Sequence, residues 1–239
     1  MHRFYASPES FTGPSVMLEQ DETRHLRDVL RLKTGDEVLV FDGVENEYRC
    51  SVRSVEKKSS ELAILERVTP ASPESPLDLT IAAAVLKSDK TDLVIQKAVE
   101  LGAASFIPLT TIRTDVKVNN AVGRVERWRR IAMEATKQCG RARLMNVAAP
   151  IGFAELMTSL TGMGSVLFSE RGGKRFSELE ASQKLTAIFG PEGGWDDAEL
   201  DLARSSGCQI ITLGGRVLRA ETAAISIAAI LQHRFGDLN

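Results

Sequence analysis

Leu185-Thr186-Ala187-Ile188-Phe189-Gly190-Pro191-Glu192-Gly193-Gly194-Trp195 joins a short apolar run to a glycine-rich loop. The run over 185–189 predicts a buried strand, and the mixed polar and apolar segment over 196–204 predicts a helix. Asp196 and Glu199 have the spacing of a capping box, which favours a helix that begins directly after the loop. A strand, a glycine loop and a helix in this order predict one unit of an α/β fold.

The same alternation extends on both sides of this loop. Apolar runs predict strands over 79–86, 105–109, 165–168 and 209–213, and longer segments predict helices over 91–101, 124–138 and 220–234. Alternation of this kind is typical of a mostly parallel sheet with helices on both faces. The last helix is apolar on nearly every side, so we expect it to be buried inside the domain or against a second subunit.

The first part of the chain has a different rhythm. It predicts short strands over 3–5, 37–41, 47–55 and 61–68 and one helix over 22–30, a spacing typical of a small barrel. Pro70, Pro73 and Pro76 then restrict the backbone between the two patterns. We therefore expect a small domain over 1–69, a linker over 70–78 and a larger domain over 79–239.

Composition excludes several classes of protein. With 239 residues, of which 43% are hydrophobic, the chain has enough apolar surface for a packed core. Cys50, Cys139 and Cys208 are too far apart for a local metal site and odd in number, so we expect thiols in a reducing cytoplasm. Neither a signal peptide nor an apolar run long enough for a membrane span is apparent, which predicts a cytosolic protein without a membrane partner. Three histidines make a metal site improbable, and we expect no metal.

Charge is unevenly spread along the chain. The formal net charge of -2 argues against a protein that coats nucleic acid over its whole surface. The segment 86–145, however, has twelve Lys or Arg against six Asp or Glu. This region is suited to binding phosphates.

A second glycine loop, Leu213-Gly214-Gly215-Arg216-Val217-Leu218-Arg219, lies between a predicted strand and the last helix. In an open parallel sheet, ligands bind outside the carboxyl ends of the strands, so both glycine loops are candidate binding loops. Either loop alone is explained as well by an ordinary tight turn, but two at one sheet edge favour a ligand site. No GxxxxGK[ST] sequence occurs, which argues against a kinase of the P-loop type.

The two loops together resemble the cofactor loops of the RsmE family of RNA methyltransferases, in the SPOUT superfamily. Other stretches that resemble the family are Arg3-Phe4, 25–31 followed by Gly35-Asp36, 97–102, 126–131 and 137–141, so the likeness extends from Arg3 to Arg234. Many relatives have a proline where this chain has Arg143-Leu144-Met145.

The resemblance implies the fold and the partners of the protein. It implies a small N-terminal PUA-like β-barrel that binds RNA and a C-terminal SPOUT α/β domain with a deep trefoil knot. It also implies a homodimer in which the RNA-binding surface of one subunit completes the site of the other. The expected partner is ribosomal RNA in the assembled small subunit, near the decoding region.

The resemblance further implies S-adenosyl-L-methionine as cofactor and N3 of a uridine in 16S ribosomal RNA as target, which gives 3-methyluridine. The two loops are expected to hold the cofactor mainly through backbone groups. The cofactor-binding residues expected on this basis are Phe189, Gly190, Pro191, Glu192, Gly193, Gly194, Leu213, Gly214, Gly215, Arg216, Val217 and Leu218.

Arg219 and Glu221 are the candidate catalytic residues. Methyl transfer requires that the uridine nitrogen be aligned with the methyl group and that the N3 proton be removed or compensated. We predict that Arg219 stabilises negative charge on the uracil, and that Glu221 orients a donor or assists proton removal. Glu221 is explained equally well as a favourable charge at a helix N-terminus.

Basic and polar residues in both domains are candidates for contact with RNA, because phosphates require charge without strict geometry. Each of them alone is also explained as a solvated surface side chain. The candidates are Arg3, Arg24, His25, Arg31, Lys33, Lys87, Lys90, Arg113, Lys137, Gln138 and Arg141.

Two other functions remain open. A SPOUT enzyme that methylates a ribose 2′-oxygen has the same kind of cofactor loops, and only the resemblance favours the base-methylating family. A non-catalytic RNA-binding module is the second alternative. Intact glycines at positions 193, 194, 214 and 215 argue against it, since a pure binder needs no cofactor crevice.

Overall fold

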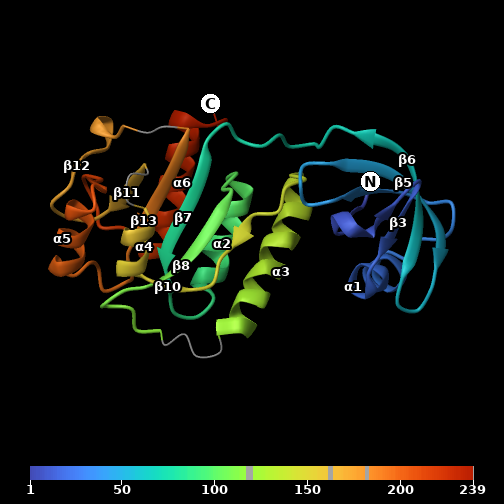
Figure 1. Cartoon of the computed structure of the whole chain (residues 1–239), viewed down its shortest axis with the longest axis horizontal. Helices are drawn as coiled ribbons and strands as arrows, with labels where there is room; N and C mark the ends of the chain where they lie inside the picture. The colour runs from blue at the N-terminus through green and yellow to red at the C-terminus, as the bar shows by residue number, and fades with distance from the viewer. Residues whose placement is uncertain (117–120, 161–163, 181–182, 239) are drawn as a thin grey trace. The chain divides into compact units, whose positions relative to one another are not determined.

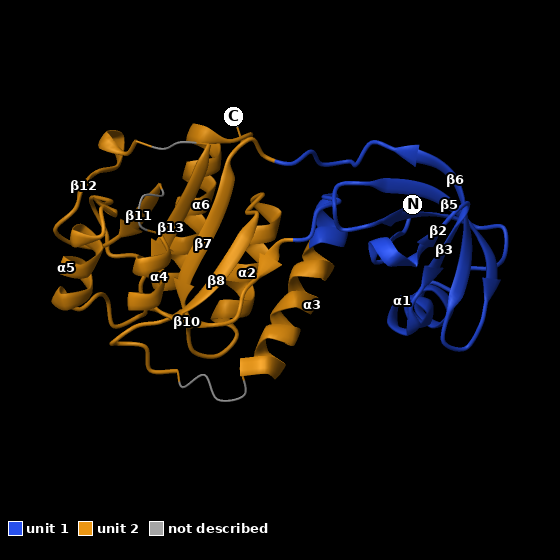
Figure 2. Cartoon of the chain, in the orientation of Figure 1, with its two compact units in different colours: residues 1–74, 136–144 blue, residues 75–135, 145–239 orange. Residues whose placement is uncertain are grey.

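The computed structural model of the chain describes residues 1–116, 121–160, 164–180 and 183–238, and its helices and strands are labelled in Figure 1. Backbone contacts divide the chain into two compact units, which Figure 2 shows in different colours. Unit 1 consists of Met1–Glu74 and Thr136–Leu144, and unit 2 of Ser75–Ala135 and Met145–Asn239. The segment Thr136–Leu144 thus belongs to unit 1, although the sequence pattern placed it in the second domain.

Unit 1 is built on a curled six-stranded sheet. Its strands follow the order β1-β4-β5-β6-β3-β2, and all neighbours are antiparallel except the parallel pair β1 and β4. Their bounds are β1 (Arg3–Tyr5), β2 (Phe11–Thr12), β3 (Ser15–Leu18), β4 (Glu37–Phe41), β5 (Glu47–Val55) and β6 (Ser60–Val68). Alternate side chains, among them Phe4, Val38 and Leu62, point to one face and form the core of the unit.

The helix predicted over 22–30 has two parts. A short α-helix, α1 (Gln20–Arg24), continues into a π-helical turn over His25–Val29. Leu26 from this turn is buried in the core of unit 1, which fixes the helix against the sheet. Strands β2 and β3 were not predicted, because a hairpin of two and four residues around Gly13 is too short to show a clear alternation.

Arg3 explains why the end of helix α3 (Ala121–Cys139) belongs to unit 1. Its guanidinium donates to the carbonyl oxygens of Thr136, Lys137 and Arg141 at 2.9–3.0 Å, and to Glu47 Oε1 at 2.7 Å. The last carbonyls of a helix have no partner within the helix, so a guanidinium at this position satisfies them. Glu47 is only 1% exposed and compensates the charge of Arg3.

Unit 2 contains an eight-stranded sheet whose strand pairs are all parallel. The order is β10-β8-β7-β13-β11-β14-β12, with β9 also paired to β8, so the chain crosses over β11 between β13 and β14. The bounds are β7 (Asp78–Ala84), β8 (Ser105–Thr110), β9 (Asn146–Val147), β10 (Ile151–Gly152), β11 (Ser165–Phe168), β12 (Lys174–Arg175), β13 (Lys184–Phe189) and β14 (Gln209–Thr212).

Helices cover both faces of this sheet, which confirms the predicted α/β class. Helices α2 (Lys90–Glu100) and α6 (Ala220–Phe235) pack together, and α6 contacts β7 and β13. Helices α4 (Phe153–Ser159) and α5 (Asp197–Ser205) pack together on the other face, where α5 contacts β14. Helix α4 was not predicted, since two turns contain too few residues to establish a helical period. Within the described ranges, no helix is long and apolar enough to span a bilayer.

Candidate functional site

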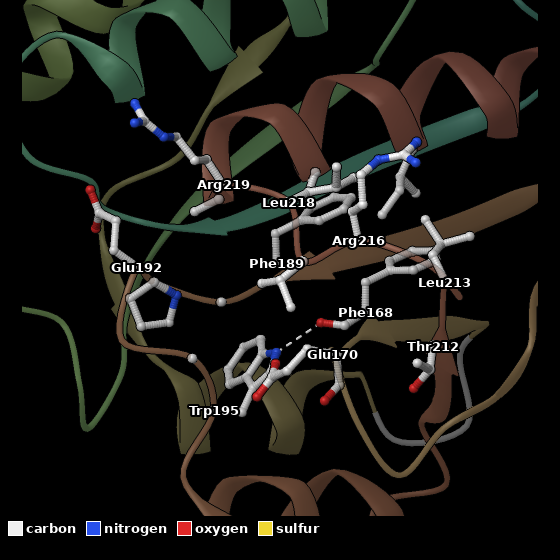
Figure 3. A pocket seen from close by; sticks show the side chains of 18 of the residues that line it. Phe168, Glu170, Phe189, Glu192, Trp195, Thr212, Leu213, Arg216, Leu218 and Arg219 are labelled. Atoms are coloured by element: carbon white, nitrogen blue, oxygen red, sulfur yellow. Dashed lines mark hydrogen bonds between the residues drawn. The ribbon is translucent and has the colours of Figure 1, made fainter.

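The two glycine loops open on one pocket of about 700 Å³ in unit 2 (Figure 3). They follow β13 and β14, which lie on either side of β11 in the sheet. The carboxyl ends of three neighbouring parallel strands therefore surround the pocket, as expected for a ligand crevice of an open α/β sheet.

Every residue that was predicted to hold the cofactor lines this pocket. The lining includes Phe189, Gly190, Pro191, Glu192, Gly193, Gly194, Leu213, Gly214, Gly215, Arg216, Val217 and Leu218. Arg219 also lines the pocket, whereas Glu221 is not among the lining residues. The sequence prediction missed a third contributor, the end of β11 with Phe168, Ser169 and Glu170. The signal for it was present, because a predicted parallel strand also ended at Phe168.

An aromatic wall forms one side of the pocket. Phe168 and Phe189 occupy matching positions in the neighbouring strands β11 and β13, and their rings stack at 5.3 Å with an interplanar angle of 9°. The apolar side chains of Leu213 and Leu218 line the same pocket. A surface of this kind suits a flat heterocycle.

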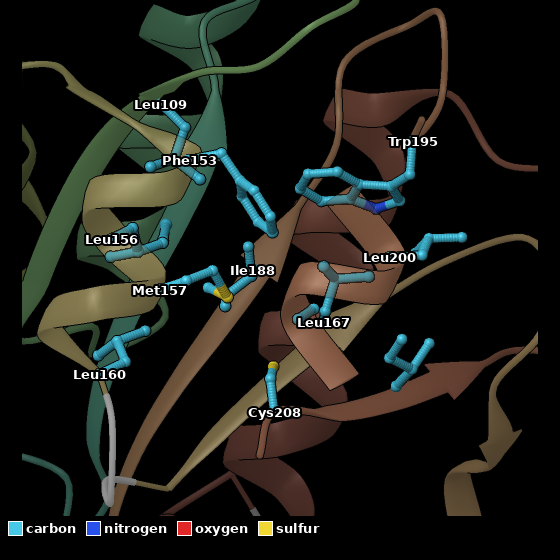
Figure 4. Packing of buried hydrophobic residues seen from close by; sticks show 13 residues of the cluster. Leu109, Phe153, Leu156, Met157, Leu160, Leu167, Ile188, Trp195, Leu200 and Cys208 are labelled. Carbon is cyan, nitrogen blue, oxygen red and sulfur yellow. The ribbon is translucent and has the colours of Figure 1, made fainter. Parts of the chain in front are cut away.

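Trp195 connects the pocket with the hydrophobic core. Its side chain is 1% exposed, packs on Phe153 at 5.0 Å, and belongs to a core cluster with Leu167 and Ile188 (Figure 4). Nε1 donates to the carbonyl oxygen of Phe168 at 2.8 Å, which ties the first loop to the end of β11. A Cβ on Gly190 would lie 2.9 Å from the indole, so only glycine allows this close approach.

The loop after β8 holds the first glycine loop in place. Arg113 donates to the carbonyl oxygen of Gly193 at 3.2 Å and to Asp196 Oδ2 at 3.1 Å. Asp196 accepts from the amide of Ala198 and forms the predicted capping box of α5 with Glu199. The amide of Ala198, and to a smaller extent Arg113, lowers the pKa of the Asp196 carboxyl. Backbone N–H groups at the start of α5 thus have hydrogen-bond partners where the loop joins the helix.

Arg171 reinforces the same region from the end of β11. Its guanidinium donates to the carbonyl oxygen of Trp195 at 2.9 Å and to Asp197 Oδ1 at 2.6 Å. Asp197 in turn raises the pKa of Arg171. Gly194 has a φ of +70°, and a Cβ there would lie 3.3 Å from a carboxylate oxygen of Glu170. Glycine at this position therefore leaves room for the Glu170 carboxylate beside the pocket.

The second glycine loop is more open. A Cβ on Gly214 or Gly215 would meet no atom within 4 Å among the described residues, and Val217 is 84% exposed. Arg219 is exposed and directly precedes α6, at whose start backbone N–H groups lack partners within the helix. The loop therefore offers backbone groups and a cation to a ligand.

Lys90 and Glu192 line the pocket, and Lys90 also pairs with Glu221 outside the lining. Lys90 Nζ is 3.1 Å from Glu192 Oε1 and 3.5 Å from Glu221 Oε2. The carboxylate of Glu221, predicted to take part in catalysis, thus pairs with Lys90.

Three of the side chains predicted to contact RNA form ion pairs within unit 1. Arg3 is bound to Glu47 and to carbonyls of the α3 end, Lys137 pairs with Glu22, and Arg141, 2% exposed, pairs with Glu74. These side chains stabilise the unit, and their contact with RNA stays a prediction.

The other candidates lie at the surface or beside the pocket. Lys90 and Arg113 contact the first glycine loop, and Lys87 pairs with Asp115 at 2.7 Å. The exposed candidates in unit 1 are Arg24, His25, Arg31, Lys33 and Gln138. His25 also packs edge-on against Phe4, at a centroid distance of 6.1 Å.

The cysteines take no part in this pocket. Cys50 and Cys208 are buried free thiols, and Cys139 is half-buried. Burial raises the pKa of Cys50 to about 12 and also raises that of Cys208. In the part of the chain that the structure describes, no group of three or more His, Cys, Asp or Glu side chains is arranged to hold a metal ion.

Comparisons with known families match both parts of the chain. The RNA methyltransferase domain matches residues 73–232, and the RNA methyltransferase PUA domain matches residues 18–65. The chain is 34% identical over 237 residues to the ribosomal RNA small subunit methyltransferase E of Synechocystis. The matched region covers 96% of this chain and 77% of the relative. It is 28% identical to the protein of the same name from Bacillus subtilis, over 93% of this chain and 91% of the relative.

Solved structures give the same assignment. The ribosomal RNA small subunit methyltransferase E of Neisseria gonorrhoeae, bound to S-adenosyl methionine, is 32% identical with a TM-score of 0.90 and full coverage of both chains. A putative methyltransferase of Legionella pneumophila, in complex with the same cofactor, is 30% identical with a TM-score of 0.91, over 99% of this chain and 98% of the other. This chain therefore belongs to the RsmE family of RNA methyltransferases, with a PUA domain in its N-terminal part and a methyltransferase domain in its C-terminal part.

Proposed function

We propose that this protein transfers the methyl group of S-adenosylmethionine to N3 of a uridine in small-subunit ribosomal RNA. The product is 3-methyluridine. The observation that carries the proposal is the pocket between the two glycine loops, in a chain that matches cofactor-bound relatives over its whole length.

The residues that line the pocket fit this cofactor. Its volume of about 700 Å³ lies within the usual range for small-molecule sites. The stacked rings of Phe168 and Phe189 suit the adenine, and the open glycine loops present backbone groups to the polar parts. The Glu170 carboxylate and the Thr212 hydroxyl add polar groups to the lining.

The bound cofactor supplies an electrophilic methyl group. The residues of the chain must then orient the uracil, exclude water and stabilise the negative charge that develops as N3 loses its proton. Arg219 is suited to this last task, because its exposed guanidinium stands at the pocket and directly before the start of α6. We propose Arg219 as a catalytic residue. Glu221 pairs with Lys90, and we propose that it acts through that pair.

We further propose that the substrate is the assembled small subunit and that the protein is a cytoplasmic homodimer. Apolar side chains that unit 2 leaves exposed support the dimer: Leu93 on α2 is 41% exposed, Ile230 on α6 is 38% exposed, and Val217 is 84% exposed.

An Ile230→Glu variant is expected to shift the protein from dimer to monomer in sedimentation equilibrium, because a carboxylate cannot be buried in an apolar interface without a partner. Leu65→Glu, a change at an exposed apolar residue in unit 1, is the control and should leave the dimer intact. A wild-type protein that sediments as a monomer would contradict the proposal.

Arg113→Ala is expected to weaken binding of S-adenosylmethionine by roughly two- to fivefold, as for the loss of other partly exposed ion pairs. The first glycine loop loses its anchor at the Gly193 carbonyl and at Asp196. Isothermal titration calorimetry without RNA measures the effect. Arg53→Ala removes an ion pair with Glu61 that has the same 3.1 Å distance but lies in unit 1, and should leave cofactor affinity unchanged.

Methyl transfer to small subunits tests the function itself. Labelled cofactor is incubated with small subunits from cells that lack the modification, and in parallel with protein-free 16S RNA. Label in the RNA of the subunits, and much less in naked RNA, is the expected result. Cofactor binding without transfer to either substrate would favour a non-catalytic RNA-binding module.

A further inference from the structure

Lys90 connects the two sides of the cofactor pocket. Its ammonium lies 3.1 Å from a carboxylate oxygen of Glu192, in the first glycine loop, and 3.5 Å from one of Glu221, in the first turn of α6. The three side chains come from elements that are distant in the sequence. One cation therefore links the loop after β13 to the helix that follows the second glycine loop.

The Glu221 end of this link is shielded from water. The side chain is 13% exposed, and Oε2 is buried without a hydrogen bond among the described residues. A carboxylate oxygen removed from solvent requires compensation by a nearby positive charge. The ammonium of Lys90 provides that charge.

The position of Lys90 in the fold is electrostatically unfavourable for a lysine whose charge is compensated by solvent alone. It is the first residue of α2, where the positive end of the helix dipole opposes a cation. Ser88, two residues earlier, has a φ of +58°, a left-handed conformation that costs energy in a residue other than glycine. Lys90 therefore stands at a helix start that disfavours its charge, and the carboxylates of Glu192 and Glu221 compensate that charge.

We propose that Lys90 is a positioning residue that forms an ionic latch with Glu192 and Glu221. The latch holds the first glycine loop to the start of α6, the helix that follows the second glycine loop, and sets how tightly the pocket retains S-adenosylmethionine. This inference rests on the proposed cofactor pocket. It gives Lys90 a role other than the phosphate contact predicted from the sequence, because two carboxylates already share the ammonium.

Lys90→Met tests the latch by cofactor binding in the absence of RNA. The change keeps the length of the side chain and removes the charge. We expect the dissociation constant to rise by about tenfold, which corresponds to ~1.4 kcal/mol. The rise should come mainly from faster dissociation, and Lys90→Arg should restore most of the affinity.

Lys87→Met is the matched control. Lys87 lies three residues before Lys90, in the segment that precedes α2, but its ammonium pairs with Asp115 at 2.7 Å, which raises its pKa, and it does not line the pocket. We expect wild-type cofactor affinity for this variant. Glu192→Gln should weaken binding in the same direction as Lys90→Met, and adding it to Lys90→Met should change little, since Lys90→Met already removes the pair with Glu192.

The alternative role of Lys90 gives a different pattern. If Lys90 binds a phosphate, Lys90→Met leaves cofactor affinity unchanged, raises the KM for the small subunit and reduces the dependence of RNA binding on salt. That result would overturn the latch. If Lys90→Met does not fold, as judged by its thermal unfolding, Glu192→Gln carries the test, and its unchanged affinity would overturn the latch as well. Failure of the wild-type protein to bind the cofactor would overturn the proposed function together with the latch.

Discussion

Arg219→Ala is expected to lower kcat for methyl transfer by roughly a hundred- to a thousandfold, the effect of removing one preorganised charge-stabilising donor. The guanidinium of Arg219 is exposed beside the pocket and makes no hydrogen bond as the N-cap of α6. Its loss should therefore leave the fold and the cofactor site intact. Single-turnover transfer to small subunits at saturating cofactor measures the change.

Two controls separate this effect from structural damage. Arg204→Ala removes an exposed arginine whose partner is Asp201 on the same helix, and should retain full activity. Arg219→Lys keeps the charge without the planar fork of donors and should recover only part of the rate. An Arg219→Ala protein with wild-type kcat and wild-type cofactor affinity would exclude Arg219 from catalysis.

Trp195→Ala is expected to destabilise unit 2 by about 3–5 kcal/mol, the usual cost of a buried aromatic truncation. The indole is 1% exposed, packs on Phe153, and donates to the Phe168 carbonyl at 2.8 Å. The cavity would open between the hydrophobic core and the first glycine loop. Urea unfolding followed by circular dichroism measures the loss, and cofactor affinity should fall with it.

Trp195→Phe distinguishes packing from hydrogen bonding. It keeps an aromatic ring but leaves the Phe168 carbonyl without its donor, so we expect a smaller loss of about 1–3 kcal/mol. Trp128→Phe is the comparison, since Trp128 is also buried and donates to Asp92 but does not line the pocket. Its cofactor affinity should stay unchanged. An unaltered urea midpoint for Trp195→Ala would contradict the role of Trp195 as the link between pocket and core.

The helices and strands that are determined by residues close together in the sequence could be predicted. The apolar run before Gly190 and the capping box of Asp196 and Glu199 predicted β13 and the start of α5, and the structure places both there. Strand β4 has the predicted bounds because glycine turns at Gly35 and Gly43 flank its apolar run, and β5 has them because its nine residues give a longer pattern. The parallel sheet followed from the alternation of strands and helices, and with it the edge where both glycine loops meet.

Contacts between distant residues could not be predicted in this way. No residue near Arg3 in the sequence indicates that its guanidinium binds Glu47 and the end of α3. The end of α3 is more than 130 residues away in the sequence. The pair of Arg141 with Glu74 also joins residues that are distant in the sequence, so both arginines were predicted to be surface residues that contact RNA. The pairing of Lys90 with Glu192 and Glu221 is hidden for the same reason, because it depends on which strand ends meet in the folded sheet.

The most direct test of the central claim is nucleoside analysis by mass spectrometry after methyl transfer. Purified small subunits that lack the modification are incubated with the protein and S-adenosylmethionine carrying a deuterated methyl group. We expect the label in 3-methyluridine of the small-subunit RNA. Label on a ribose 2′-oxygen would contradict it in favour of 2′-O-methylation, and RNA without label would contradict the assignment as an enzyme that acts on the small subunit.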